Sequence, residues 1–136
     1  MKRNESAVES FLAGVRHEAQ CKNNCMEYLF SAECRGGKSY SVRIEVTADD
    51  DCGIQCEFPL SDSQKASVNA ETLRNLNSRL HMNRTMVTVF VEDGCAIAST
   101  GTSGEIFNEK SLALRLASVL EAASQLDLCL ARMDQG

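Results

Sequence analysis

Apolar and polar residues alternate with a period of two in three segments in the first half of the chain. Residues 26–34, 40–47 and 54–58 show this pattern, and residues 40–47 show it most clearly. One face of each segment is then apolar and the other polar, which is typical of strands in a sheet with one buried face. A glycine pair within residues 35–38 and the aspartates at 49–51 separate the segments. The pattern therefore predicts three strands joined by turns.

Both ends of the chain show the period of three to four residues that is typical of helices. Val8, Phe11 and Val15 share one face of a helix predicted over residues 6–20. Near the other end, Asn108 is a suitable N-cap for a long amphipathic helix. The apolar stripe of that helix consists of Leu112, Leu116, Val119, Leu120, Ala123, Leu126 and Leu130.

A third helix is predicted in the middle of the chain. Leu73, Leu76 and Leu80 follow one another at spacings of three and four residues, and Asn69 precedes them as an N-cap. The polar residues 60–67 before this helix predict a loop.

A hairpin is predicted directly after the middle helix. Residues 86–91 are β-branched or apolar with little polar interruption, so both faces of this strand should be covered. Either the chain's own helices or a second subunit could cover the second face, because periodicity does not distinguish the two. Residues 92–94 then allow a tight turn into a last strand at residues 95–100.

These elements predict an α+β fold in the order α-β-β-β-α-β-β-α, with an antiparallel five-stranded sheet and helices packed on it. The chain has 136 residues and one proline, and no linker or internal repeat divides it. We therefore expect a single domain over residues 1–136, large enough to fold around one core without a metal or disulfide.

The charge distribution bears on possible partners. The net charge is −5, and the 14 basic residues are scattered among 19 acidic ones. Nucleic-acid binding needs clustered Lys and Arg, so this class of function is not expected. No segment has the pattern of a signal peptide or a membrane span, and we expect a cytoplasmic protein without membrane insertion.

The seven cysteines are an odd number at irregular spacings, which favours free thiols. Cys21, Cys25, Cys52 and Cys56 could in principle supply four thiolates to zinc. The two pairs, however, have three residues between the cysteines rather than the usual two, and Cys56 falls on the apolar face of its strand. Packing of free thiols is the favoured interpretation, and no cofactor is predicted.

Catalytic interpretations rest on few residues. His17 and Cys21 would lie one helical turn apart next to Glu18, as in the zinc hydrolase motif, but the second histidine of that motif is missing. A cysteine nucleophile paired with His17 or His81 is allowed by composition alone. A small cysteine, histidine or metal enzyme therefore remains an alternative, and the favoured hypothesis is a protein without enzymatic activity.

Two glycine-containing segments could in principle hold an anion. Residues 32–39 fit a relaxed phosphate-loop pattern, but such a loop opens a helix, whereas Ser39 here precedes a strand. Residues 101–104 precede the last helix, where a flexible connection explains four small residues equally well.

The predicted order of elements, the acidity and the pair Leu76-Asn77 in the middle helix resemble the class I type III secretion chaperones and the related YbjN-type proteins. The resemblance covers nearly the whole chain in topology. It implies a bacterial, cytoplasmic homodimer that keeps a segment of a secretion substrate extended along grooves and strand edges. A YbjN-like protein of regulatory or unknown role is the alternative within the same fold.

Two sets of residues follow from these hypotheses. The dimer interface is predicted on the middle helix and the strand after it, and its residues are Leu73, Leu76, Leu80, Met86, Thr88 and Phe90. The partner protein is predicted to bind between the first helix and residues 26–34, which we expect at an edge of the sheet because they form its first strand in sequence. The candidate contacts there are Phe11, Val15, Tyr28 and Phe30.

Overall fold

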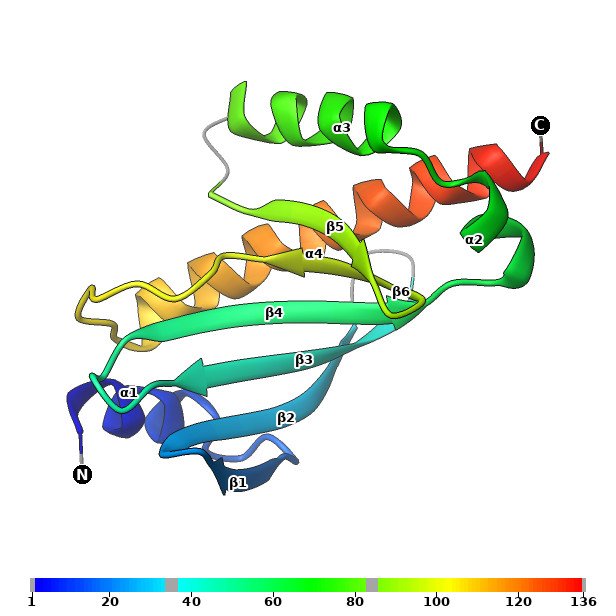
Figure 1. Cartoon of the computed structure of the whole chain (residues 1–136). Helices are drawn as coiled ribbons and strands as arrows, with labels where there is room; N and C mark the ends of the chain where they lie inside the picture. Colours follow the sequence, from blue (N-terminus) through cyan, green and yellow to red (C-terminus); the bar gives the residue numbers. More distant parts are fainter. Residues whose placement is uncertain (1, 34–36, 83–85, 136) are drawn as a thin grey trace.

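The computed structural model describes residues 2–33, 37–82 and 86–135, with the backbone alone for residues 133–135. In this part of the chain, an antiparallel sheet of six strands is combined with four helices (Figure 1). The elements are α1 (Arg3–Phe11), β1 (Glu18–Lys22), β2 (Cys25–Glu33), β3 (Ser39–Val46), β4 (Cys52–Pro59), α2 (Asp62–Ser67), α3 (Ala70–Met82), β5 (Thr88–Glu92), β6 (Cys95–Ser99) and α4 (Glu109–Gln135). The α+β class and the antiparallel sheet are confirmed, but the sheet has six strands and not five.

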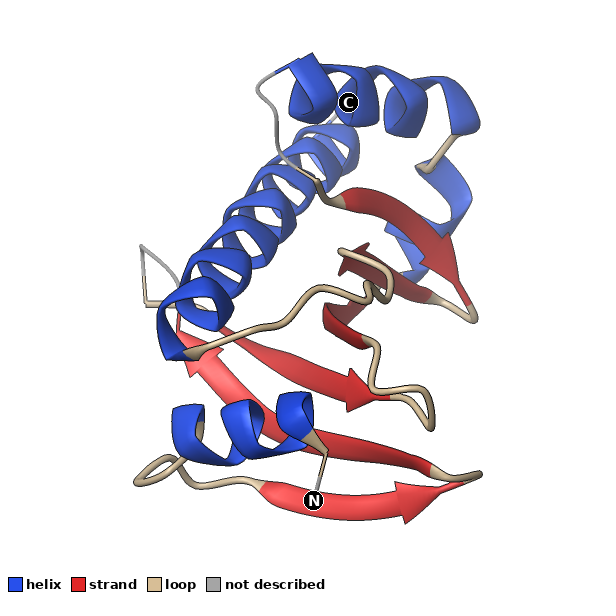
Figure 2. Cartoon of the chain, turned by 90° about the vertical axis from the view of Figure 1, so that its left-hand side faces the viewer, coloured by secondary structure: helices blue, strands red, loops and turns tan. Residues whose placement is uncertain are grey.

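The strands lie in the order β1-β2-β3-β4-β6-β5. Each neighbouring pair is antiparallel. The sheet therefore has β1 at one edge and β5 at the other. In Figure 2 the N-terminus lies beside α1 at one end of the molecule, and the C-terminus lies at the other end.

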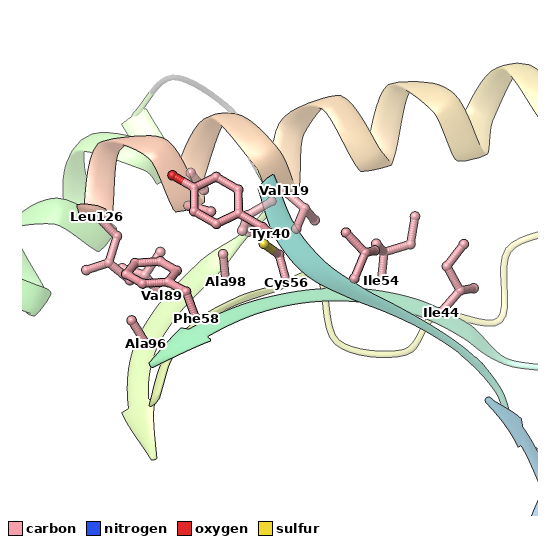
Figure 3. Close-up of a cluster of buried hydrophobic side chains, with 14 of the residues drawn as sticks. Tyr40, Ile44, Ile54, Cys56, Phe58, Val89, Ala96, Ala98, Val119 and Leu126 are labelled. Atoms are coloured by element: carbon pink, nitrogen blue, oxygen red, sulfur yellow. The ribbon is translucent and has the colours of Figure 1, made fainter. Parts of the chain in front are cut away.

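The core lies between one face of the sheet and the helices α1 and α4. Figure 3 shows Tyr40, Cys56 and Phe58 extending from the strands toward α4. Alternate residues of β3 are buried, as the two-residue period predicts, and the residues between them are exposed or half-buried. The residues of the core that are least exposed and largest are Tyr28, Leu12, Ile44, Leu76, Leu80, Leu112, Leu126 and Leu130.

The predicted N-caps of the two long helices are confirmed. The Asn69 side chain accepts a hydrogen bond from the backbone N–H of Thr72 at 2.9 Å, and α3 begins at Ala70. The Asn108 side chain accepts one from Ser111 N–H, also at 2.9 Å. Each bond satisfies an N–H group that has no partner within the first turn of its helix.

The first helix is shorter than predicted, and a loop followed by the strand β1 replaces its second half. The helix α1 ends at Phe11, and Gly14 has a φ of +83°, which a helix cannot contain. Asn23 and Asn24 both have positive φ, and they form the two-residue turn of a β1–β2 hairpin just after the predicted end of the first helix.

The predicted loop at residues 60–67 contains the short helix α2. Ser61 caps it: its hydroxyl accepts from Gln64 N–H, and the Gln64 side chain accepts from Ser61 N–H. This reciprocal pair is the capping box, which the sequence Ser-x-x-Gln signals. The prediction missed it because the segment has no apolar stripe.

The remaining turns agree with the prediction where the structure describes them. Asp50 has positive φ between β3 and β4, and Asp93 and Gly94 close the β5–β6 hairpin with positive φ at both positions. The predicted turn at 35–38 lies partly outside the described residues, and β2 and β3 pair on either side of it. Among the described residues, no helix has the length and apolar character needed to cross a membrane.

Candidate functional site

The strand β2 extends beyond its neighbour β1 at one end. The β1 strand begins at Glu18, which pairs with Leu29, whereas β2 continues to Glu33. Among the described residues, four residues of β2 therefore have β3 on one side and no strand on the other. The sheet edge changes from β1 to β2 at this point.

The hairpin fixes which backbone groups of this free segment face outward. A two-residue turn closes on a hydrogen-bonded pair, here Lys22 and Cys25, and the bonded pairs then recur at every second residue. By this alternation the N–H and C=O groups of Ser31 and Glu33 point away from β3. Both residues are exposed, so their outward groups can accept a further strand.

A groove of about 620 Å³ lies beside the free segment. Its lining comes from the loop that precedes β1, the first residue of β1, and the strands β2, β3 and β4: Val15, Arg16, His17, Glu18, Leu29, Phe30, Ser31, Ser41, Val42 and Glu57. Val15 is 42% exposed in this loop. The groove therefore combines apolar side chains with charges of both signs next to an unpaired strand edge.

His17, in the loop before β1 that lines one side of the groove, makes two contacts. Its Nδ1 lies 2.8 Å from the carbonyl oxygen of Val15, and its ring lies 6.3 Å from the ring of Tyr28. Tyr28 is buried beneath, and burial raises its pKa to about 12. The loop is thus attached to a buried residue of β2.

The four predicted partner contacts separate into two pairs. Val15 and Phe30 line the same groove. Phe11 does not line this groove and, like Phe30, packs partly buried against the core, and Tyr28 is only 1% exposed. The expectation that residues 26–34 lie at the sheet edge is wrong for residues 26–29, which pair with β1.

The six predicted interface residues are also separated. Leu76 and Leu80 are buried by the chain's own elements, and Leu73 packs partly buried against the core. Met86 and Thr88 are exposed. Phe90 is half-buried and pairs with Ile97 across β5 and β6.

The second face of β5 is not enclosed by the chain's own helices. The strand lies at the sheet edge, and on this face Thr88 is exposed and Phe90 is half-buried. Coverage of this face by the chain's own helices is therefore not observed among the described residues, and coverage by a second subunit stays a prediction. Met86 also lines a smaller groove of about 230 Å³ with the exposed Leu114 of α4. An apolar surface therefore remains near the start of β5.

The cysteines do not converge on one site among the described residues. Cys21 is exposed on β1, whereas Cys52 and Cys56 are buried on the core face of β4. Burial, and next the nearby Asp50, raise the pKa of Cys52 to about 12, so this thiol is protonated at neutral pH. In the part of the chain that the structure describes, no group of three or more histidine, cysteine or acidic side chains could hold a metal ion.

The other candidate motifs also acquire structural roles. His17 lies in a loop and Cys21 in a strand, so the helical spacing on which a zinc hydrolase motif depends does not exist. Ser39 begins β3, as predicted, and not a helix. Residues 101–104 end five residues before α4, and Ser103 forms two backbone hydrogen bonds with Cys52.

The sequence prediction missed Ser31 and Arg16 as residues of the candidate site. The signal for Ser31 was the Asn23-Asn24 pair, because a hairpin turn there fixes the length of β1 and exposes the end of β2. Searches of family models, curated proteins and solved structures found no match to this chain. The resemblance to secretion chaperones stays a prediction.

Proposed function

We propose that the protein is a non-enzymatic adaptor that binds an extended segment of a partner protein at the free end of β2. The observation that carries this proposal is the four-residue difference in length between β1 and β2, which leaves the outward groups of Ser31 and Glu33 without a β1 partner. A bound segment would continue the line of β1 and form backbone hydrogen bonds with these groups. A chaperone that binds an extended segment of a secretion substrate would be one example of such an adaptor.

The adjacent groove gives this mode of binding its side-chain selectivity. Side chains of an added strand point alternately to the two faces of the sheet. One of them would enter the groove against Val15 and Leu29, which favours an apolar residue at that position. At the lining, Arg16 supplies a positive charge and Glu18 and Glu57 supply negative charges for polar neighbours.

A proline substitution tests the backbone contact. Ser31→Pro removes the outward N–H while the β2–β3 ladder, which uses the alternate residues, keeps its hydrogen bonds. Ser31→Thr is the matched control, because threonine keeps the N–H and suits a strand. Peptides selected by the wild-type chain from a random decapeptide display library would be titrated against all three proteins.

We expect Ser31→Thr to bind the selected peptides within about threefold of wild type and Ser31→Pro to lose at least tenfold in affinity, about 1.4 kcal/mol. Thermal melting checks that both variants remain folded. Equal binding by folded Ser31→Pro would show that the peptide does not pair with β2. A Val15→Glu variant tests the groove separately, since it leaves the strand edge intact.

A further inference from the structure

The strand β1 forms an open edge along its whole length. All five of its residues, from Glu18 to Lys22, are exposed. Its ladder partner is β2, and in the part of the chain that the structure describes the sheet order places no strand on its other side. Within the described residues, neither Glu18 nor Lys22 forms an ion pair.

The turn at Asn23-Asn24 fixes the direction of the backbone groups of β1. Glu18, Gln20 and Lys22 pair with β2 through hydrogen bonds, by the same alternation as above. Ala19 and Cys21 lie between them, so their N–H and C=O groups point outward. Any strand that joins β1 must bond to these two residues.

We propose that β1 pairs with β1 of a second copy of this chain, antiparallel about a twofold axis through Gln20. In this register Ala19 lies opposite the second copy's Cys21, and their outward groups form the hydrogen-bonded pairs. The same register places Glu18 opposite the second copy's Lys22 on one face of the sheet. The ion pair occurs twice, because the twofold axis makes the interface isologous.

The charge pattern of β1 supports a second copy rather than another strand. Exposed edge strands commonly carry charges that discourage pairing. Here the two charges have opposite sign and are equidistant from Gln20, so antiparallel self-pairing brings unlike charges together. A parallel arrangement or a shift by two residues would lose this match.

The other edge of the sheet is not equally available. The Asn77 side chain of α3 occupies both outward groups of Val89 in β5. The predicted dimer through α3 and β5 would also require Leu76 and Leu80, which are buried within the chain. The inferred contact at β1 therefore replaces that interface, and it does not depend on the proposed peptide site.

Charge exchange provides the first test. In Glu18→Lys and in Lys22→Glu, like charges face each other across the inferred interface, whereas the double variant restores unlike charges with the order reversed. Sedimentation equilibrium at up to about 1 mM protein and low salt would measure association, since an interface of five-residue strands is small. We expect at least a tenfold lower association constant for each single variant and recovery to within threefold for the double variant. A monomeric wild type, or single variants that associate like wild type, would overturn the proposal.

A cross-link tests the register itself. Gln20→Cys, in a Cys21→Ser background, places the new thiols of the two copies directly opposite each other at a non-hydrogen-bonded pair, where the Cβ atoms lie close enough for a disulfide. Lys22→Cys in the same background is the control, because the register places position 22 opposite position 18 of the second copy. Peptide mapping should identify a disulfide between the two copies at position 20 in the first variant and none between the two copies at position 22 in the second. Equal cross-linking of both variants, or of neither, would contradict the inferred register.

Discussion

The side chain of Asn77 and the backbone of Val89 form a reciprocal pair of hydrogen bonds between helix α3 and strand β5. Asn77 Nδ2 donates to the carbonyl oxygen of Val89 at 2.9 Å, and the Val89 N–H donates to Asn77 Oδ1 at 2.7 Å. One amide side chain therefore satisfies both outward groups of an edge-strand residue. This contact explains how β5 can end the sheet without a further strand.

Asn77→Ala should lower the free energy of unfolding by about 2 kcal/mol, because two hydrogen bonds are lost and the backbone groups of Val89 lose their partners. The Val89 amide should also exchange hydrogen faster. Urea unfolding and amide exchange measure the two effects. Asn77→Asp is the control: it keeps an acceptor for the Val89 N–H and loses the donor, so its amide exchange should stay slower than that of Asn77→Ala. Unchanged exchange at Val89 in Asn77→Ala would contradict this role.

Asn4 connects three separate segments. It is 2% exposed, and its side chain donates to the carbonyl oxygens of Asp50 and Glu105 at 2.7 and 2.9 Å and accepts from Phe107 N–H at 2.9 Å. Asn4→Ala should cost about 3 kcal/mol, since it removes three hydrogen bonds at a buried position. Asn69→Ala, at an exposed N-cap, should cost about 1 kcal/mol. If denaturant unfolding gave the same loss of free energy of unfolding for Asn4→Ala and Asn69→Ala, the three hydrogen bonds of Asn4 would not stabilise the fold more than a single helix cap does.

The raised pKa of Cys52 predicts a loss of stability at alkaline pH. Its pKa rises from 9.0 to about 12 on folding, mainly through burial. As the pH rises, the unfolded chain therefore loses the Cys52 thiol proton before the folded chain does. The contribution of this thiol to the free energy of unfolding is complete below about pH 9 and decreases toward pH 12. Between pH 8 and pH 10.5 the wild type should lose about 2 kcal/mol more than Cys52→Ala. Urea unfolding at the two pH values tests this, and parallel losses in both proteins would show that Cys52 does not titrate in this way.

Gly53 allows close contact between β4 and the segment after β6. A Cβ atom at position 53 would lie 2.4 Å from the carbonyl oxygen of Gly101. Gly53→Ala should therefore lower the free energy of unfolding by about 3 kcal/mol, because the Cβ atom is fixed to the backbone of β4 and the group that it meets is also backbone. A Cβ atom at Gly14 would meet no atom within 4 Å, so Gly14→Ala should cost only about 1 kcal/mol, through its φ of +83°. Similar melting temperatures for the two variants would contradict the steric argument.

The sequence predicted the elements that have strong periodicity. In β3 the inward positions from Tyr40 to Val46 alternate with outward polar residues. This pattern lies within one short segment, so it predicts a strand whatever the order of the strands in the sheet. The helix α4 and the cap at Asn108 were predictable for the same reason. The strand β1 was not, because all its residues are exposed and no apolar face marks it.

The candidate site depends on which strands are neighbours in the sheet, and the periodicity of a single segment does not predict this. The position of β5 at the sheet edge and the overhang of β2 follow from strand order, which joins residues far apart in sequence. Val15 and Phe30 were predicted as neighbours and do line one groove, whereas Tyr28 belongs to the buried core. The pair Asn23-Asn24 was the signal that could have corrected the first helix.

Amide hydrogen exchange at Ser31 tests the proposed peptide site most directly. In the free protein its N–H points away from β3 and should exchange rapidly, whereas the N–H of Leu29, which pairs with Glu18, should be protected. When a selected peptide saturates the protein, we expect exchange at Ser31 to slow at least about tenfold and exchange at Leu29 to change little. Rapid exchange at Ser31 in the saturated complex would contradict strand addition at β2.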